Sequence, residues 1–138
     1  MVRANEFQQH CVIHDIGTPE GKLLELIGPL EDLTPDMQDK ATAFIHTMKL
    51  SFFALGIGGE GGEVMDKVKK GVRGDYDLGN MDESRRSALA LELGDDLWYI
   101  ANMAAEIGFD LTDIMQMNMD KLADRRARGK SRGDGDNR

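Results

Sequence analysis

GIGGEGGEVMDKVKK, the stretch Gly56–Lys70, joins two helix-forming segments and carries two glutamates three residues apart, Glu60 and Glu63. A second acidic pair repeats that spacing in ELGDDLWY, where Glu92 is followed by Asp95. Residues three or four apart are neighbours on a helix surface, and like charges held together repel unless a cation neutralises them. If the two helices face one another, the sequence therefore predicts four carboxylates around a divalent metal ion.

The composition is that of a globular chain with one domain-sized core. The 138 residues are 41% hydrophobic and 30% charged, and the formal net charge is −8. A chain this acidic is unlike the nucleic-acid-binding proteins, which carry a basic patch, and no stretch approaches the ~20 apolar residues of a membrane span. One cysteine, Cys11, excludes an internal disulfide, and the N-terminus lacks the apolar run of a signal peptide. We therefore expect a cytoplasmic protein without nucleic-acid or membrane partners.

Helical periodicity begins at residue 35. Thr34 followed by Pro35 predicts a helix start, because a hydroxyl caps free amides and proline is already set at a helical φ. The glycines of residues 56–62 are expected to interrupt this helix, since each costs about 1 kcal/mol in a helix interior, and a second helix is expected to end near Val72. Steps of three and four predict a buried stripe on the first helix: Met37, Ala41, Phe44, Met48, Phe52 and Leu55.

Two further helices follow a polar loop. Asp82 or Ser84 is expected to cap the first of them, and Gly108 to end it. Asp110 is expected to cap the last helix, which runs to Ala127. No strand is predicted, so the fold class is all-α, a bundle of about four main helices.

The predicted bundle occupies residues 35–127. Residues 1–34 are predicted to be a poorly defined N-terminal extension with a turn or two of loosely attached helix around Leu24. Residues 128–138 are rich in glycine and charge, which predicts a disordered tail.

The last helix places two cations and an amide within its apolar arc, at Asn118, Lys121 and Arg125. A guanidinium that faces a bundle interior needs an anionic partner, because an unpaired buried charge is very costly. That partner is expected to be the acidic cluster or a substrate phosphate beside it. Oxygen ligands without paired His or Cys favour magnesium or manganese, for which phosphate chemistry is the natural use.

Three motifs in this order, GIGGEGGEVMDKVKK, ELGDDLWYIANMAAEIG and NMDKLADR, resemble the MazG-like nucleoside triphosphate pyrophosphohydrolases of the all-α NTP pyrophosphatase superfamily. The resemblance covers about Met37–Arg126. It implies that an NTP or dNTP is converted to the monophosphate and pyrophosphate, with a metal-activated water attacking the α-phosphorus. It also implies dimers or tetramers whose helices complete one another's sites. The implied magnesium ligands and catalytic residues are Glu60, Glu63, Glu92 and Asp95, and the implied triphosphate contacts are Lys67, Asn118, Lys121 and Arg125.

Two positions depart from the family's pattern. Gly59 replaces the acid that precedes the first ligand, so a catalytically weakened nucleotide- or metal-binding module is the alternative function. Asp96 stands where an apolar residue is more common, and is a weaker candidate for a metal contact. Lys70 is another weak site candidate, and Trp98 and Tyr99 are weak candidates for a pocket wall, Trp98 also for a subunit interface. A purely structural hypothesis treats the acids as the solvated face of an oligomeric bundle.

Overall fold

A computed structural model describes residues 3–13 and 19–130, which form five α-helices and two short 3-10 turns. The described residues contain no strand, which confirms the all-α class. The predicted disordered tail lies outside the described residues from position 131 onward. In chain order the elements are α1 (Ala4–Ile13), α2 (Pro19–Ile27), η1 (Leu30–Asp32), α3 (Pro35–Val72), η2 (Leu78–Asn80), α4 (Glu83–Glu106) and α5 (Leu111–Ala127).

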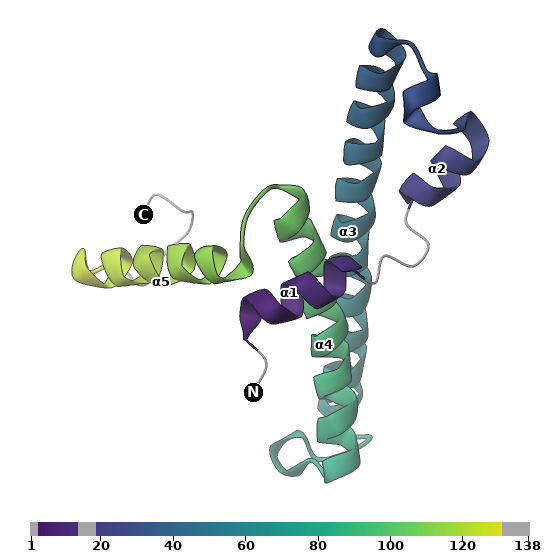
Figure 1. Cartoon of the computed structure of the whole chain (residues 1–138). Coiled ribbons are helices and arrows are strands. Elements are labelled where there is room, and N and C mark those ends of the chain that lie inside the picture. The colour runs from purple at the N-terminus through teal and green to yellow at the C-terminus, as the bar shows by residue number, and fades with distance from the viewer. Residues whose placement is uncertain (1–2, 14–18, 131–138) are drawn as a thin grey trace.

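α3 is one continuous helix of 38 residues, so the predicted interruption at residues 56–62 is wrong. It starts where expected, after Thr34, although that side chain makes no capping hydrogen bond. Figure 1 shows α3 and α4 as a long antiparallel pair, and packing along this pair offsets the weak helix propensity of glycine. A Cβ on Gly56 would lie 2.2 Å from the ring of Tyr99, so the glycine permits the close approach of α4.

α4 begins and ends where the sequence predicts. Asp82 caps the helix by accepting a hydrogen bond from the backbone N–H of Arg85 at 2.9 Å. At the other end Gly108 has a φ of 78°, in the left-handed region that favours glycine. The N–H of Phe109 then donates to the carbonyl of Ala104 at 2.9 Å, which satisfies one of the last carbonyls of the helix.

The N-terminal extension contributes to the core. α1 packs across α4 and reaches α5, as Figure 1 shows. Cys11 is 1% exposed and clusters with Ala101 and Leu111, and Trp98 packs against this cluster. The sequence prediction of residues 1–34 missed α1 because its ten residues show no clear apolar stripe. Trp98 thus packs toward the core of this chain, and its place in a subunit interface stays a prediction.

Much of the stripe predicted to be core on α3 is exposed in the single chain. Ile45 and Phe53, which lie beside that stripe, are buried instead. The exposed members are 38% to 77% accessible, namely Met37, Phe44, Met48 and Leu55. Large apolar side chains are also exposed on the other two long helices: Leu91, Leu93, Leu97, Met115, Met117, Met119 and Leu122. Where exposed apolar side chains form a large contiguous patch, they are typical of surfaces that contact a partner.

By length and composition alone, α3 is the one described helix that is apolar enough to cross a membrane. The expectation that no stretch approaches a membrane span is therefore wrong by this criterion, because α3 is long and combines apolar residues with few charges over part of its length. Only 11% of its apolar window is buried inside the structure. A single such helix is weak evidence for a membrane, since helices that pack in bundles pass the same test.

Candidate metal centre

Three of the four predicted ligands converge where α3 passes α4. Glu60, Glu92 and Asp95 each bring one carboxylate oxygen to within 4.8 Å of the others. Glu60 and Glu92 are half-buried and Asp95 is exposed, so the cluster is open to solvent on one side. The antiparallel packing of the two helices produces this convergence, which the sequence predicted for four carboxylates and the structure shows for three.

Glu63, the fourth predicted ligand, lies outside this group of three. It is exposed on α3, three residues beyond Glu60. Its charge still acts on the cluster, because it contributes to the raised pKa of Glu60. Its role as a ligand remains a prediction.

The cluster carries unbalanced negative charge. Burial raises the pKa of the Glu60 carboxyl, and the charges of Asp95 and Glu92 raise it further, with smaller contributions from Glu63 and Asp96. A raised carboxyl pKa means that the ionised form is disfavoured at this position. A bound cation would remove that cost.

Lys67 brings a positive charge to the edge of the cluster. Its Nζ lies 2.9 Å from Oε1 of Glu92, and this hydrogen bond is the main reason why the pKa of Lys67 is raised. The lysine thus pairs across the helix interface, in addition to its attraction to Glu63 on its own helix. This position fits its predicted role beside the phosphates of a substrate.

Lys70, the weaker cationic candidate, is turned toward its own helix. Its Nζ lies 2.5 Å from Asp66, which also accepts a hydrogen bond from Lys69. The hydrogen bonds from Lys69 and Lys70 lower the pKa of Asp66 to about 2. Lys70 therefore has a partner away from the acidic cluster.

Asp96 places a further carboxylate between the two helices. Its Oδ1 is buried and, among the described residues, has no hydrogen-bond partner. The same oxygen lies 4.0 Å from where a Cβ of Gly61 would be. A buried acceptor without a partner calls for an explanation such as an ion or a water, and a donor set made only of carboxylate oxygens suits Mg²⁺ or Mn²⁺. The residues present therefore fit a divalent cation.

Tyr99 and Trp98 pack at the α3–α4 seam, next to the acids. The ring of Tyr99 meets Phe52 edge to face at 5.9 Å between centroids, and Trp98 at 4.9 Å. Both side chains are half-buried. Their visible role is to hold the two helices together, while a role in a base pocket remains a prediction.

α5 does not face the cluster of its own chain. Figure 1 shows it leaving the end of α4 and running away from the α3–α4 pair. Asn118 and Lys121 are exposed and line a pocket of about 490 Å³ with Phe109 and Met117, while Arg125 is buried. The prediction that Asn118 and Lys121 face the interior is wrong for the single chain, because α5 does not fold back along α4.

A second polar group was missed by sequence reasoning. Glu106 on α4 accepts hydrogen bonds at 2.8 Å from His46 Nδ1 and from Lys49 Nζ, both on α3. Burial opposes ionisation of Glu106, but the hydrogen bonds from Lys49 and His46 prevail and lower its pKa. No local pattern in the sequence indicates this group, because the two α3 residues and Glu106 lie about 60 positions apart along the chain.

Comparison with known proteins matches the same part of the chain. The MazG nucleotide pyrophosphohydrolase domain family matches residues 51–129. The Gene 37 protein of Mycobacterium phage L5 is 43% identical over 89 residues, which are 64% of this chain and 76% of that protein. No solved structure matches. The family match includes both acidic pairs and α5, and leaves α1 and α2 outside it.

Proposed function

This chain belongs to the MazG nucleotide pyrophosphohydrolase family, and we propose that it hydrolyses a nucleoside triphosphate to the monophosphate and pyrophosphate with a magnesium or manganese ion. Family membership supports nucleotide pyrophosphohydrolase activity in general. The observation that carries the finer proposal is the convergence of Glu60, Glu92 and Asp95, with Lys67 at the edge of the group.

Each residue of the site has a distinct task in this proposal. Glu60, Glu92 and Asp95 would hold the cation, and Glu63 would join them from the next turn of α3. A cation held there would neutralise phosphate charge and lower the pKa of a water for attack at the α-phosphorus. Lys67 is the partner of Glu92 in this structure, and would turn to a phosphate oxygen when the cation takes over that carboxylate.

We further propose that two or four copies of the chain assemble and share sites. The phosphate-binding candidates Asn118, Lys121 and Arg125 lie on a helix that runs away from the acids of its own chain. Exposed apolar side chains line α3, α4 and α5, and would be covered by a second copy. In such an assembly α5 of one copy would reach the acids of another.

A nucleotide- or metal-binding module with weakened catalysis is the second candidate. Gly59 favours it, because the family's pattern has an acid at this position. Gly59 is exposed, and no described atom outside its own helix backbone lies within 4 Å of where its Cβ would be. The site therefore has room for an acid that the sequence does not provide.

A nucleotide panel tests the proposal. The protein is incubated with each NTP and dNTP plus Mg²⁺, and the products are identified. Pyrophosphate and a monophosphate are expected, whereas release of single phosphates, or no turnover of any nucleotide, would contradict the proposal. Thermal stabilisation by Mg²⁺ plus nucleotide, with the nucleotide recovered unchanged, would support the binding module instead.

A matched pair of variants tests the assignment of the site. Glu60→Gln removes one charge from the cluster and is expected to abolish turnover, while the helical signal stays intact. Glu31→Gln removes the same charge from an exposed position on η1 and is expected to leave turnover unchanged. If Glu60→Gln retains full activity, the acids of this cluster do not hold the catalytic cation.

A further inference from the structure

The first turn of α5 is capped by α1 rather than by its own N-cap residue. Asp110 occupies the N-cap position, but its side chain makes no capping hydrogen bond. Instead, Oε1 of Gln8 accepts a hydrogen bond from the N–H of Leu111 at 2.7 Å, and Oδ1 of Asn5 accepts one from the N–H of Thr112 at 3.1 Å. These are two of the N–H groups that a helix leaves without an internal partner.

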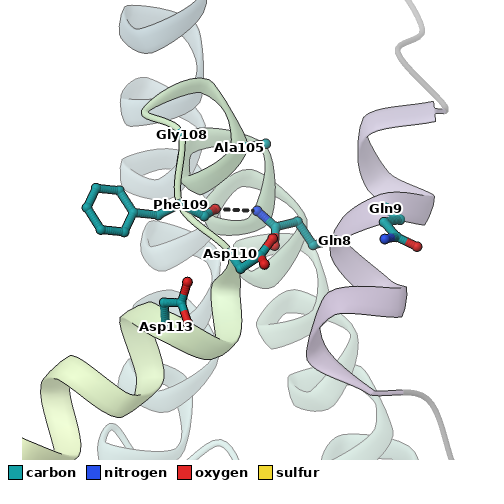
Figure 2. Close-up of a pocket in the computed structure, with 7 residues that line it drawn as sticks. All are labelled: Gln8, Gln9, Ala105, Gly108, Phe109, Asp110 and Asp113. Carbon is teal, nitrogen blue, oxygen red and sulfur yellow. Dashed lines mark hydrogen bonds between the residues drawn. The ribbon is translucent and has the colours of Figure 1, made fainter.

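The side-chain amide of Gln8 donates hydrogen bonds as well as accepting one. Its Nε2 donates to the carbonyl of Phe109 at 2.9 Å, which Figure 2 shows, and to the carbonyl of Ala101 at 3.4 Å. Gln8 is 5% exposed, so these bonds are largely shielded from water. Among residues of this size only a neutral amide both donates and accepts in this way. One side chain of α1 thus joins α4, the connecting turn and the start of α5.

Asn5 adds a second attachment from the same helix. Its Oδ1 accepts a hydrogen bond from the hydroxyl of Thr112 at 2.7 Å, besides the one from the backbone. The attachment is exposed, in contrast to that of Gln8. α1 therefore holds the beginning of α5 at two points.

These bonds fix the direction in which α5 leaves the bundle. Its main packing partners among the described elements are α1 and α4. From Leu111 to Arg125 the helix is about 20 Å long, so a rotation of about 10° at its start would displace Arg125 by roughly 4 Å. A rotation of that size would move the far end of α5 by more than the length of a hydrogen bond.

We propose that α1 is a positioning element for α5, and that Gln8 and Asn5 set the direction in which α5 presents Asn118 and Lys121 to the triphosphate. The proposal rests on the proposed function, in which α5 carries the phosphate-binding residues. α1 lies outside the residues that match the MazG family, which begin at 51, so the family match assigns it no role. The acids lie on α3 and α4, and the direct packing of these two helices brings them together.

The test compares two variants of α1 with two controls. Gln8→Met keeps the size of the side chain and removes its hydrogen bonds, and Asn5→Ala removes the exposed attachment. Gln9→Met changes an exposed neighbour that points away from Phe109 in Figure 2. Asn5→Asp keeps the acceptor oxygen and is expected to behave as the wild type.

Three measurements separate positioning from folding. Hydrogen exchange at the Leu111 and Thr112 amides is expected to accelerate in Gln8→Met and Asn5→Ala and to stay slow in both controls. The Kd for Mg²⁺ alone is expected to stay unchanged. The KM and the Kd for nucleotide with Mg²⁺ are expected to rise on the order of 10-fold, because misplaced binding groups lose much of their effect.

The possible failures are distinguishable. Faster amide exchange with unchanged KM and nucleotide Kd would overturn the positioning role alone. If Gln8→Met does not fold, the pair Asn5→Ala and Asn5→Asp decides the question by the same measurements. A wild-type protein that binds nucleotide without turnover overturns the proposed hydrolysis, while its nucleotide Kd still tests positioning. A wild-type protein that binds no nucleotide overturns both.

Discussion

Replacing Gly56 by alanine tests the packing that holds the two acidic helices in register. In the structure a Cβ at this position would lie 2.2 Å from two ring carbons of Tyr99 and 2.6 Å from a third. Carbon atoms pack at about 3.5–4.0 Å, so the ring, or the helix that carries it, must move by about 1.5 Å. Tyr99 lies one helical turn beyond Asp95, so the displacement also reaches the acidic cluster.

The expected loss of stability follows from two opposing effects. Overpacking costs about 1–3 kcal/mol, whereas replacing glycine by alanine inside a helix gains about 1 kcal/mol. Gly56→Ala is therefore expected to lose about 1 kcal/mol, which lowers the Tm of a domain of this size by about 4 °C. Gly62→Ala is the matched control, since no described atom outside its own helix backbone lies within 4 Å of its added Cβ. It is expected to gain about 1 kcal/mol.

Thermal unfolding of both metal-free variants gives the two changes in stability, and titration with Mn²⁺ reports on the acidic cluster. Gly56→Ala is expected to bind Mn²⁺ more weakly than Gly62→Ala does. A Gly56→Ala protein as stable as the wild type would refute the close packing of Tyr99 on α3. Equal destabilisation by both substitutions would show that the cost comes from a feature common to the two glycines, and not from the tyrosine ring.

Four further outcomes follow from the charges and exposure at the site. The raised pKa of Glu60 means that the folded metal-free protein gains stability as pH falls through that pKa. Glu60→Gln is therefore expected to raise the metal-free Tm at pH 7 and to flatten this dependence of Tm on pH. The same substitution is expected to abolish stabilisation by Mg²⁺. Asp96→Asn is expected to weaken Mg²⁺ binding about 10-fold in calorimetry, whereas Asp39→Asn, on an exposed face of α3, leaves it unchanged. Gly59→Glu is expected to raise kcat if the missing acid limits turnover, and an unchanged kcat would remove Gly59 as evidence for a weakened enzyme. A refolded equal mixture of Glu60→Gln and Lys121→Ala is expected to regain about a quarter of wild-type activity if dimers share sites between copies, and none if each chain forms its own site.

The parts of the fold that the sequence predicts are those with a local cause. Asp82 caps α4 because its carboxylate reaches a backbone N–H three residues away, and Gly108 ends the helix because it adopts a positive φ. The convergence of Glu60 with Glu92 follows from equal spacing on two helices that pack side by side. In each case the structural feature can be predicted from a few neighbouring residues or from a spacing that recurs in the sequence.

The features that sequence reasoning missed depend on distant partners. Glycine lowers helix propensity at each position of residues 56–62, but the packing of Tyr99 against Gly56 is a tertiary contact that no local pattern reports. Gln8 bonds to groups about one hundred positions further along the chain, and a glutamine followed by a second glutamine in a short helix carries no signal of this. The hydrogen bonds that hold the start of α5 likewise come from α1, and no pattern within α5 reports them.

The exposed apolar faces and the outward direction of α5 have a single explanation in the proposed assembly. A lone chain has an acidic cluster with Lys67 at its edge, and a helix whose Asn118 and Lys121 lie elsewhere on the molecule. It also leaves Phe44, Leu55 and the methionines of α5 in contact with water, which is unfavourable for large apolar side chains. A second copy packed on these faces would bury the apolar residues and bring the cations of one chain to the acids of the other. The apolar faces that are exposed in the single chain are therefore the surface on which a second copy would complete the active site.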